Sequence, residues 1–153
     1  MMRAAAEARD NSGAASPHHP KLLGVTLLTS MNAGTLRRVG ISGTLSSRVV
    51  KLARLSKRSG LDGVVASPEE VRAIRRACGK KFLIVVPGIR PNGRTPGARG
   101  GKLLKDDQAR VATPAEAIRA GADYLVVGRP ITAAPDPESA ARAILEEIAA
   151  AIA

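Results

Sequence analysis

A glycine and an arginine follow a short apolar segment near the C-terminal end of the chain. Residues 123–127 are mostly aromatic or β-branched and lie between Gly121 and Gly128, which predicts a strand covered on both faces. Gly128 allows a ligand to approach its backbone N–H, and the planar guanidinium of Arg129 suits phosphate. Pro130 is typical of a first helical turn, whose free N–H groups attract anions. This unit predicts an anion-binding site.

The other predicted strands are also followed by polar residues or glycines. Six such residues lie just past strand ends: Thr29, Ser67, Gly88, Arg90, Gly128 and Arg129. Active sites of folds with parallel strands lie at this edge of the sheet. No strand end carries Lys, Asp, Glu or His, so no group is placed for proton transfer or nucleophilic attack. Asp106 and Asp107 are more typical of a solvated loop.

The elements that must position these residues alternate along the chain. Strands are predicted over 22–28, 61–66, 82–86 and 123–127, and helices over 4–8, 46–59, 67–79, 113–121 and from 137 to the end. Repeated strand–helix units predict an α/β fold with a parallel sheet, either a small open sheet or half of an eight-stranded barrel. Ser67 with Glu70, and Thr113 with Glu116, have the spacing of capping boxes.

Two loops interrupt this pattern. Residues 11–20 form a polar loop that contains His18 and His19. No further His, Cys or acidic cluster supports these histidines, so we expect no metal site there. The loop over 87–112 is rich in Gly, Pro and Lys and is too long for an ordinary connection, which favours a functional lid.

The charge of the chain is concentrated in its centre. The 153 residues carry a net charge of +11, and residues 21–105 contain 18 Lys or Arg against three acids. A basic centre is compatible with nucleic-acid binding. However, Arg72, Arg75 and Arg76 have the spacing of a solvated helix face, and Phe82 and Tyr124 alone cannot supply base stacking. We therefore expect no nucleic-acid partner.

Composition also limits the compartment. Cys78 is the only cysteine, which excludes an internal disulfide and favours a reducing, cytoplasmic location. No apolar run approaches the length of a membrane span, so we expect no membrane partner. The first ten residues lack a signal-peptide core.

Five motifs, taken together and in this order, resemble the C-terminal half of orotidine 5'-phosphate decarboxylase. They are Leu27-Leu28-Thr29-Ser30-Met31, Gly60-Leu61-Asp62-Gly63-Val64-Val65, Pro87-Gly88-Ile89-Arg90-Pro91, Asp107-Gln108-Ala109-Arg110 and Val127-Gly128-Arg129-Pro130-Ile131-Thr132. The resemblance implies a TIM (β/α)8 barrel of which residues 1–153 form the last four βα units, strands 5–8, with a preceding helix. It also implies a homodimer, no metal or organic cofactor, and conversion of orotidine 5'-monophosphate (OMP) to UMP.

The same resemblance implies ligand contacts for five residues. Thr29 would touch the nucleotide portion of the substrate, and Gln108 would reach from the long loop to the phosphate and pyrimidine. Arg90, Gly128 and Arg129 would surround the phosphate. Without the resemblance, Thr29 is equally compatible with a strand-end cap, Gln108 with a loop polar residue and Arg90 with a surface charge.

Two departures accompany the resemblance. The catalytic Asp-x-Lys-x-x-Asp motif of the family is not in this sequence, so no catalytic residue is assigned and the 153-residue chain alone is predicted to be inactive. The segment between Arg90 and Gln108 is longer than in familiar members and is basic. Two alternatives are another phosphosugar-binding barrel, such as a hexulose-phosphate synthase, and a basic non-enzymatic protein that binds nucleic acid.

Overall fold

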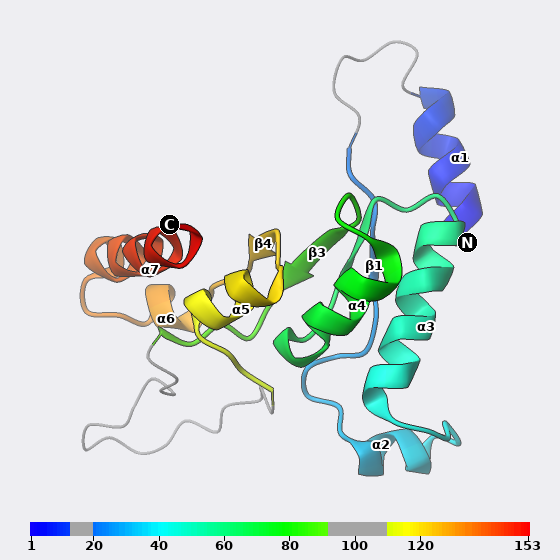
Figure 1. The fold of residues 1–153 in the computed structure, drawn as a ribbon, viewed down its shortest axis with the longest axis horizontal. Coiled ribbons are helices and arrows are strands. Elements are labelled where there is room, and N and C mark those ends of the chain that lie inside the picture. The colour runs from blue at the N-terminus through cyan, green and yellow to red at the C-terminus, as the bar shows by residue number, and fades with distance from the viewer. Residues whose placement is uncertain (13–19, 92–109) are drawn as a thin grey trace.

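The computed structural model describes residues 1–12, 20–91 and 110–153, and its elements repeat a strand–helix unit four times (Figure 1). They are, in order, α1 (Met2–Ser12), β1 (Leu23–Val25), α2 (Ala33–Arg38), α3 (Leu45–Arg58), β2 (Gly63–Val65), η2 (Pro68–Glu70), α4 (Val71–Cys78), β3 (Leu83–Val86), α5 (Pro114–Ala120), β4 (Tyr124–Leu125), α6 (Arg129–Thr132) and α7 (Pro137–Ile152). The predicted α/β class is confirmed. Within the described ranges, no helix is both long and apolar enough to cross a membrane.

The four strands form one parallel sheet in the order β1-β2-β3-β4. The register places Val25, Val65, Val85 and Tyr124 in one row across the sheet. Each strand therefore pairs with the next strand in the sequence, as short right-handed crossovers favour. All four carboxyl ends consequently lie at the same edge of the sheet.

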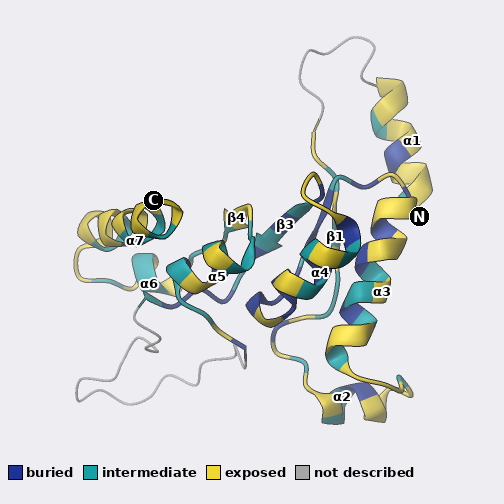
Figure 2. Ribbon diagram, viewed as in Figure 1, coloured by how far each residue is buried: buried dark blue, intermediate teal, exposed yellow. Residues whose placement is uncertain are grey.

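The hydrophobic core lies between one face of the sheet and helices α3, α4 and α5. Val64, Ile84 and Val86 point from the strands into this core and are fully buried, as are Val49 of α3 and Ile74 of α4 (Figure 2). Burying an aliphatic side chain of this size stabilises the fold by about 1.5–3 kcal/mol. Along β3 the core positions alternate, because Ile84 and Val86 face the helices whereas Leu83 and Val85 are only half-buried.

The opposite face of the sheet is partly open, which corrects the expectation for the last strand. Tyr124 is 58% and Val126 is 51% exposed, so this segment is not covered on both faces. Val25, in the same row as Tyr124, is 64% exposed. The apolar run over 123–127 indicated a strand correctly, although β4 itself covers only Tyr124–Leu125, and its composition did not reveal which neighbours are present.

Two aspartates tie the strands together at the amino edge of the sheet. Asp62 precedes β2 and accepts a hydrogen bond of 2.8 Å from the Leu22 N–H, and Asp123 precedes β4 and accepts one of 2.7 Å from the Ile84 N–H. Arg75 contacts Asp123 at 2.6 Å. Each carboxylate thus satisfies the amide of a neighbouring strand and pairs with an arginine. The pattern is typical of the structural rather than the functional edge of such sheets.

Several predicted boundaries need correction. The strand expected over 22–28 is shortened to Leu23–Val25. The Thr26 N–H makes its last ladder bond, to Val65 O at 3.1 Å, and the Thr26 hydroxyl donates to the same oxygen at 2.9 Å. The strand expected over 61–66 is shortened to Gly63–Val65. Helix α2 was not predicted. It begins where Asn32 accepts a hydrogen bond of 2.9 Å from the Thr35 N–H.

The two predicted capping boxes have different outcomes. The box of Thr113 and Glu116 is confirmed, with reciprocal hydrogen bonds of 3.1 and 2.9 Å. The Ser67 hydroxyl instead accepts a longer bond of 3.4 Å from the Glu69 N–H, so the reciprocal hydrogen bonds of a capping box are not formed. Glu70 is engaged in a distant ion pair, which local sequence spacing cannot reveal.

Candidate functional site

Thr29 lies in a turn that follows β1 at the carboxyl edge of the sheet. Its side chain is buried and lines a small cavity of about 210 Å³ between the ends of β1, β2 and β3. The turn is closed by a hydrogen bond of 3.0 Å from the Met31 N–H to Leu28 O. The structure therefore places Thr29 at the edge where its predicted role requires it.

The segment after β3 is held by a short parallel bridge. Gly88 has a φ of 77°, a conformation that favours glycine, and its carbonyl accepts a hydrogen bond of 3.3 Å from the Ala112 N–H. The Arg90 N–H donates to Ala112 O at 2.9 Å, and Ile89 between them is fully buried. The Arg90 side chain is only 4% exposed and donates from Nη1 to Ile89 O at 2.9 Å. Arg90 is therefore no ordinary surface charge.

Gly128 and Arg129 follow β4 and begin the short helix α6. The Gly128 carbonyl accepts hydrogen bonds from the amides of Ile131 and Thr132, at 2.9 and 3.1 Å. Apart from its chain neighbours, no described residue has an atom within 4 Å of the position that a Cβ would take at Gly128, and Gly128 is exposed, so its backbone is open to a ligand. Arg129 is likewise exposed. The strand–Gly–Arg–turn unit predicted from the sequence is confirmed as local structure.

Sheet order determines which predicted residues are near one another. Arg90 and Arg129 follow the neighbouring strands β3 and β4, and Thr29 follows β1 at the far side of the sheet. Gln108 and most of the predicted loop over 87–112 lie outside the described residues, as do His18 and His19. Among the residues that are described, no group of three His, Cys, Asp or Glu side chains could hold a metal ion.

A buried ion pair at this edge was missed by reasoning from the sequence. Glu70 Oε1 and Arg110 Nη1 are 2.7 Å apart, and the residues are only 2% and 6% exposed. Arg110 Nη2 also donates to Leu28 O at 3.1 Å, next to Thr29. The sequence offered only the weak signal of an arginine in the Asp-Gln-x-Arg motif, because its partner is 40 residues away.

The surroundings of this pair shift the titration of its carboxyl group. Burial raises the pKa of Glu70 above its usual value, and the nearby Glu69 adds to this effect, while the Arg110 charge opposes it. Among the described residues, Glu70 Oε2 and Arg110 Nε find no hydrogen-bond partner. The pair is thus deeply buried but incompletely satisfied.

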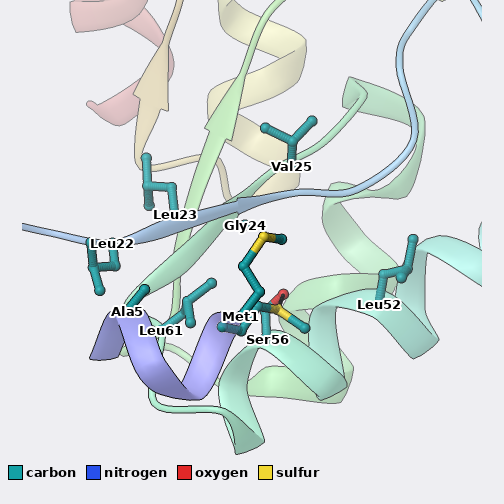
Figure 3. Close-up of a pocket in the computed structure, with 10 residues that line it drawn as sticks. Met1, Ala5, Leu22, Leu23, Gly24, Val25, Leu52, Ser56 and Leu61 are labelled. Carbon is teal, nitrogen blue, oxygen red and sulfur yellow. Dashed lines mark hydrogen bonds between the residues drawn. The ribbon is translucent and has the colours of Figure 1, made fainter. Parts of the chain in front are cut away.

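A larger pocket lies elsewhere and has little capacity for chemistry. It has a volume of about 480 Å³ and is formed between α1, β1 and α3 (Figure 3). Met1, Leu23, Val25, Leu52 and Leu61 line it with apolar groups. Its side-chain polar group, the Ser56 hydroxyl, contacts the sulfur of Met2 at 3.7 Å. The pocket follows the outer edge of β1 rather than the carboxyl edge of the sheet.

Comparison with known proteins agrees with this arrangement. The model of the orotidine 5'-phosphate decarboxylase / HUMPS family matches residues 1–144. The chain belongs to this family. Family members adopt the TIM-barrel fold, and the four parallel strands with their covering helices are consistent with it.

Similar proteins are longer than this chain. Orotidine 5'-phosphate decarboxylase of Geobacter sp. (strain M21) is 51% identical over 98% of this chain and 59% of its own length. The decarboxylase of Moorella thermoacetica is 52% identical over 97% of this chain and 56% of its own length. A crystal structure of the enzyme from Lactobacillus acidophilus matches with a TM-score of 0.76 and 37% identity, over 97% of this chain and 58% of that one. The chain thus spans under two thirds of these relatives.

Proposed function

We propose that residues 1–153 are the C-terminal half of the barrel of an orotidine 5'-phosphate decarboxylase. In this proposal β1 to β4 are strands 5–8 of the barrel, and α1 is the helix that precedes strand 5. The observation that carries the proposal is the high identity to decarboxylases over nearly the whole chain. The position of the candidate residues at the carboxyl edge of a parallel sheet supports it independently.

Five residues then contact the nucleotide. Thr29 binds the nucleotide portion, and Gln108 reaches the phosphate and pyrimidine. Arg90, Gly128 and Arg129 bind the phosphate, Gly128 through its N–H and Arg129 through two parallel hydrogen bonds of its guanidinium. The open backbone at Gly128 and the exposure of Arg129 support these roles. Arg90 is only 4% exposed, so its guanidinium can contact the phosphate directly only if the side chain rearranges. Otherwise it acts on the phosphate through its positive charge alone.

The chemical step requires groups beyond these residues. The decarboxylation of OMP to UMP and CO2 needs the charged Asp-x-Lys-x-x-Asp set, which this sequence does not contain. We therefore assign binding and orientation of the substrate to this chain and no catalytic residue. We propose that the whole enzyme is a cytoplasmic homodimer that works without a cofactor.

The alternatives are less well supported. A hexulose-phosphate synthase belongs to the same broad family, but the relatives that share half of their residues with this chain are decarboxylases. If the chain were a basic nucleic-acid-binding protein, its relatives should bind nucleic acid. The similar proteins are instead orotidine 5'-phosphate decarboxylases, which act on a mononucleotide.

Activity of a completed chain tests the proposal. We expect no release of CO2 from OMP by residues 1–153 alone. Joining them to the segment of the Geobacter sp. relative that this chain does not match should give a decarboxylase, here termed the completed chain. Turnover by residues 1–153 alone, or none by a folded completed chain, would contradict the proposal.

Arg129→Ala tests the phosphate site. In the completed chain this change should weaken UMP binding about ten- to a hundredfold, since a charge-assisted hydrogen bond is worth about 1.5–3 kcal/mol. Affinity for uridine, which lacks the phosphate, should not change. The control is Arg142→Ala, because Arg142 is an exposed arginine of α7 that pairs with Glu138. Isothermal calorimetry measures the affinity of the unsubstituted completed chain and of both variants for each ligand, and an unchanged UMP affinity in Arg129→Ala would reject the site.

A further inference from the structure

The Glu70–Arg110 pair connects three segments that are distant in sequence. Arg110 Nη1 binds Glu70, just after β2, and Arg110 Nη2 binds Leu28 O, 82 residues away. Two residues after Arg110, Ala112 exchanges backbone hydrogen bonds with Gly88 and Arg90. One guanidinium therefore lies at the junction of the segments that follow β1, β2 and β3.

The pair is poorly suited to a purely stabilising role. Glu70 Oε2 and Arg110 Nε are buried, and no described residue gives either atom a hydrogen bond. Desolvation of two charges offsets much of their attraction, and an apolar pair of similar size is often as stable. What the ion pair provides beyond stability is direction, because the planar fork of Arg110 binds a carboxylate and a carbonyl at fixed angles.

The carbonyl that Arg110 binds belongs to the turn that carries Thr29. Leu28 O accepts two hydrogen bonds, one from Arg110 Nη2 at 3.1 Å and one from the Met31 N–H at 3.0 Å. Thr29 lies between these two attachment points. Fixing Leu28 O therefore fixes the backbone of Thr29, which lines the cavity at the ends of the first three strands.

We propose that Glu70 and Arg110 are positioning residues, which hold the Leu28–Met31 turn so that Thr29 contacts the nucleotide. Glu70 orients the guanidinium, and the guanidinium holds Leu28 O. Neither residue touches the substrate. The inference rests on the proposed function for the identity of the ligand, but the contact between Arg110 and the turn is a property of the protein alone.

A double-mutant cycle tests the link to Thr29. In the completed chain, Glu70→Met with Arg110→Met removes both charges together, so that no lone buried charge remains to unfold the protein. We expect this paired variant to raise the KM for OMP and the dissociation constant of UMP about tenfold. If the pair acts through Thr29, adding Thr29→Ala should cost no further affinity beyond Thr29→Ala alone. Additive losses would overturn the proposal, as would wild-type affinity in the paired variant.

The ion pair at the opposite edge of the sheet supplies the control. Arg75 and Asp123 form an ion pair of 2.6 Å, and Arg75 also binds a backbone carbonyl, that of Gly121, at 2.7 Å. Asp123→Asn should lower the thermal midpoint without changing the affinity for UMP. If Asp123→Asn weakened UMP binding as much as the paired variant does, the weaker binding would reflect general destabilisation of the sheet and not the contact between Arg110 and the Leu28–Met31 turn.

Amide exchange separates this inference from the proposed function. The Met31 N–H shares its acceptor with Arg110, so it should exchange at least several-fold faster in the paired variant, while core amides such as that of Ile84 keep their rates. This measurement needs no ligand. Absence of UMP binding by the unsubstituted completed chain would reject the nucleotide assignment, and an unchanged Met31 rate would reject the positioning role.

Discussion

At the scale of single residues, the arginines of this chain differ widely in what they contact. Arg75 was expected on a solvated helix face with its neighbours, but it is only partly exposed and donates to the carbonyls of Gly79, Lys80, Phe82 and Gly121 as well as to Asp123. Arg110 is buried, and Arg129 is exposed. A guanidinium has five N–H donors in one plane, so arginine can bind several backbone carbonyls, pair with a buried carboxylate or remain exposed to a ligand. Net charge therefore overstates the basic surface available to a partner.

Asp62 makes the free energy of unfolding depend on pH in the acidic range. Burial opposes its ionisation, but the Leu22 N–H and the charges of Arg9 and Lys21 outweigh burial, and the pKa of Asp62 is lowered below 3.8. A folded pKa below the unfolded pKa stabilises the protein above the unfolded value, and this contribution is lost as pH falls through the folded pKa. Because Asp62 is partly solvated, the loss should be no more than about 1 kcal/mol.

Urea unfolding measures this effect. Between pH 6 and pH 2.5 the unsubstituted chain should lose more free energy of unfolding than Asp62→Asn, which lacks the titrating group. Asp136, whose pKa is also lowered by hydrogen bonds from Ser139, titrates in both proteins and cancels in the difference. Equal losses in the two proteins would show that Asp62 does not couple folding to pH.

At the scale of elements, close contact between strands depends on one glycine. A Cβ built on Gly63 of β2 would lie 2.3 Å from Leu83 O of β3. The obstacle is backbone, which can move only by disturbing the register that pairs Gly63 with Leu83. Gly63, in one of the five motifs that resemble the decarboxylase family, therefore has a packing reason to be glycine.

Gly63→Ala should lower the free energy of unfolding by about 1–3 kcal/mol, because the methyl group overpacks the sheet. Gly34→Ala is the matched control. Gly34 lies in the helix α2, where Ala is intrinsically favoured by up to about 1 kcal/mol, and the nearest atom to its Cβ position is the Asn32 side chain at 3.1 Å. Chemical denaturation compares the two, and equal effects would show that the contact with Leu83 O is not limiting.

At the scale of the whole molecule, the sheet has a covered face and an open one. Helices α3, α4 and α5 bury one side, whereas Val25, Leu28, Tyr124 and Val126 remain more than half exposed (Figure 2). The outer edges of β1 and β4 have no strand beside them within the described residues. Exposed apolar faces and free strand edges favour association. In the proposed barrel, the same surfaces would face its interior and the first half of the ring.

Residues 1–153 alone should therefore associate in a concentration-dependent manner. Sedimentation velocity should show dimers or larger species, and Val25→Lys with Tyr124→Lys should shift them towards monomer, because charges are costly to bury in an apolar interface. Leu145→Lys is the control, since Leu145 is 65% exposed on α7, away from the sheet. A monomeric unsubstituted chain, or an equal effect of Leu145→Lys, would contradict association through this face.

Local patterns in the sequence were sufficient for the order and type of most elements. Alternating apolar segments and helix starts such as Thr113-Pro114 depend on neighbours within four residues, so the four strand–helix units and one capping box were predicted correctly. The strand–Gly–Arg unit at Gly128 was found for the same reason. The motifs that resemble the decarboxylase family added the family itself, which the comparisons confirm.

Tertiary structure decided the contacts that join distant segments. Glu70 has the spacing of a capping residue, yet it pairs with Arg110, 40 residues away, because both side chains are enclosed between the ends of three strands. Arg75 likewise donates to backbone carbonyls outside its own helix, among them those of Phe82 and Gly121, although its spacing is that of a solvated helix face. Exposure of Tyr124 is likewise fixed by which elements pack beside it and not by its own segment. Each depends on the packing of the sheet, which no local pattern encodes.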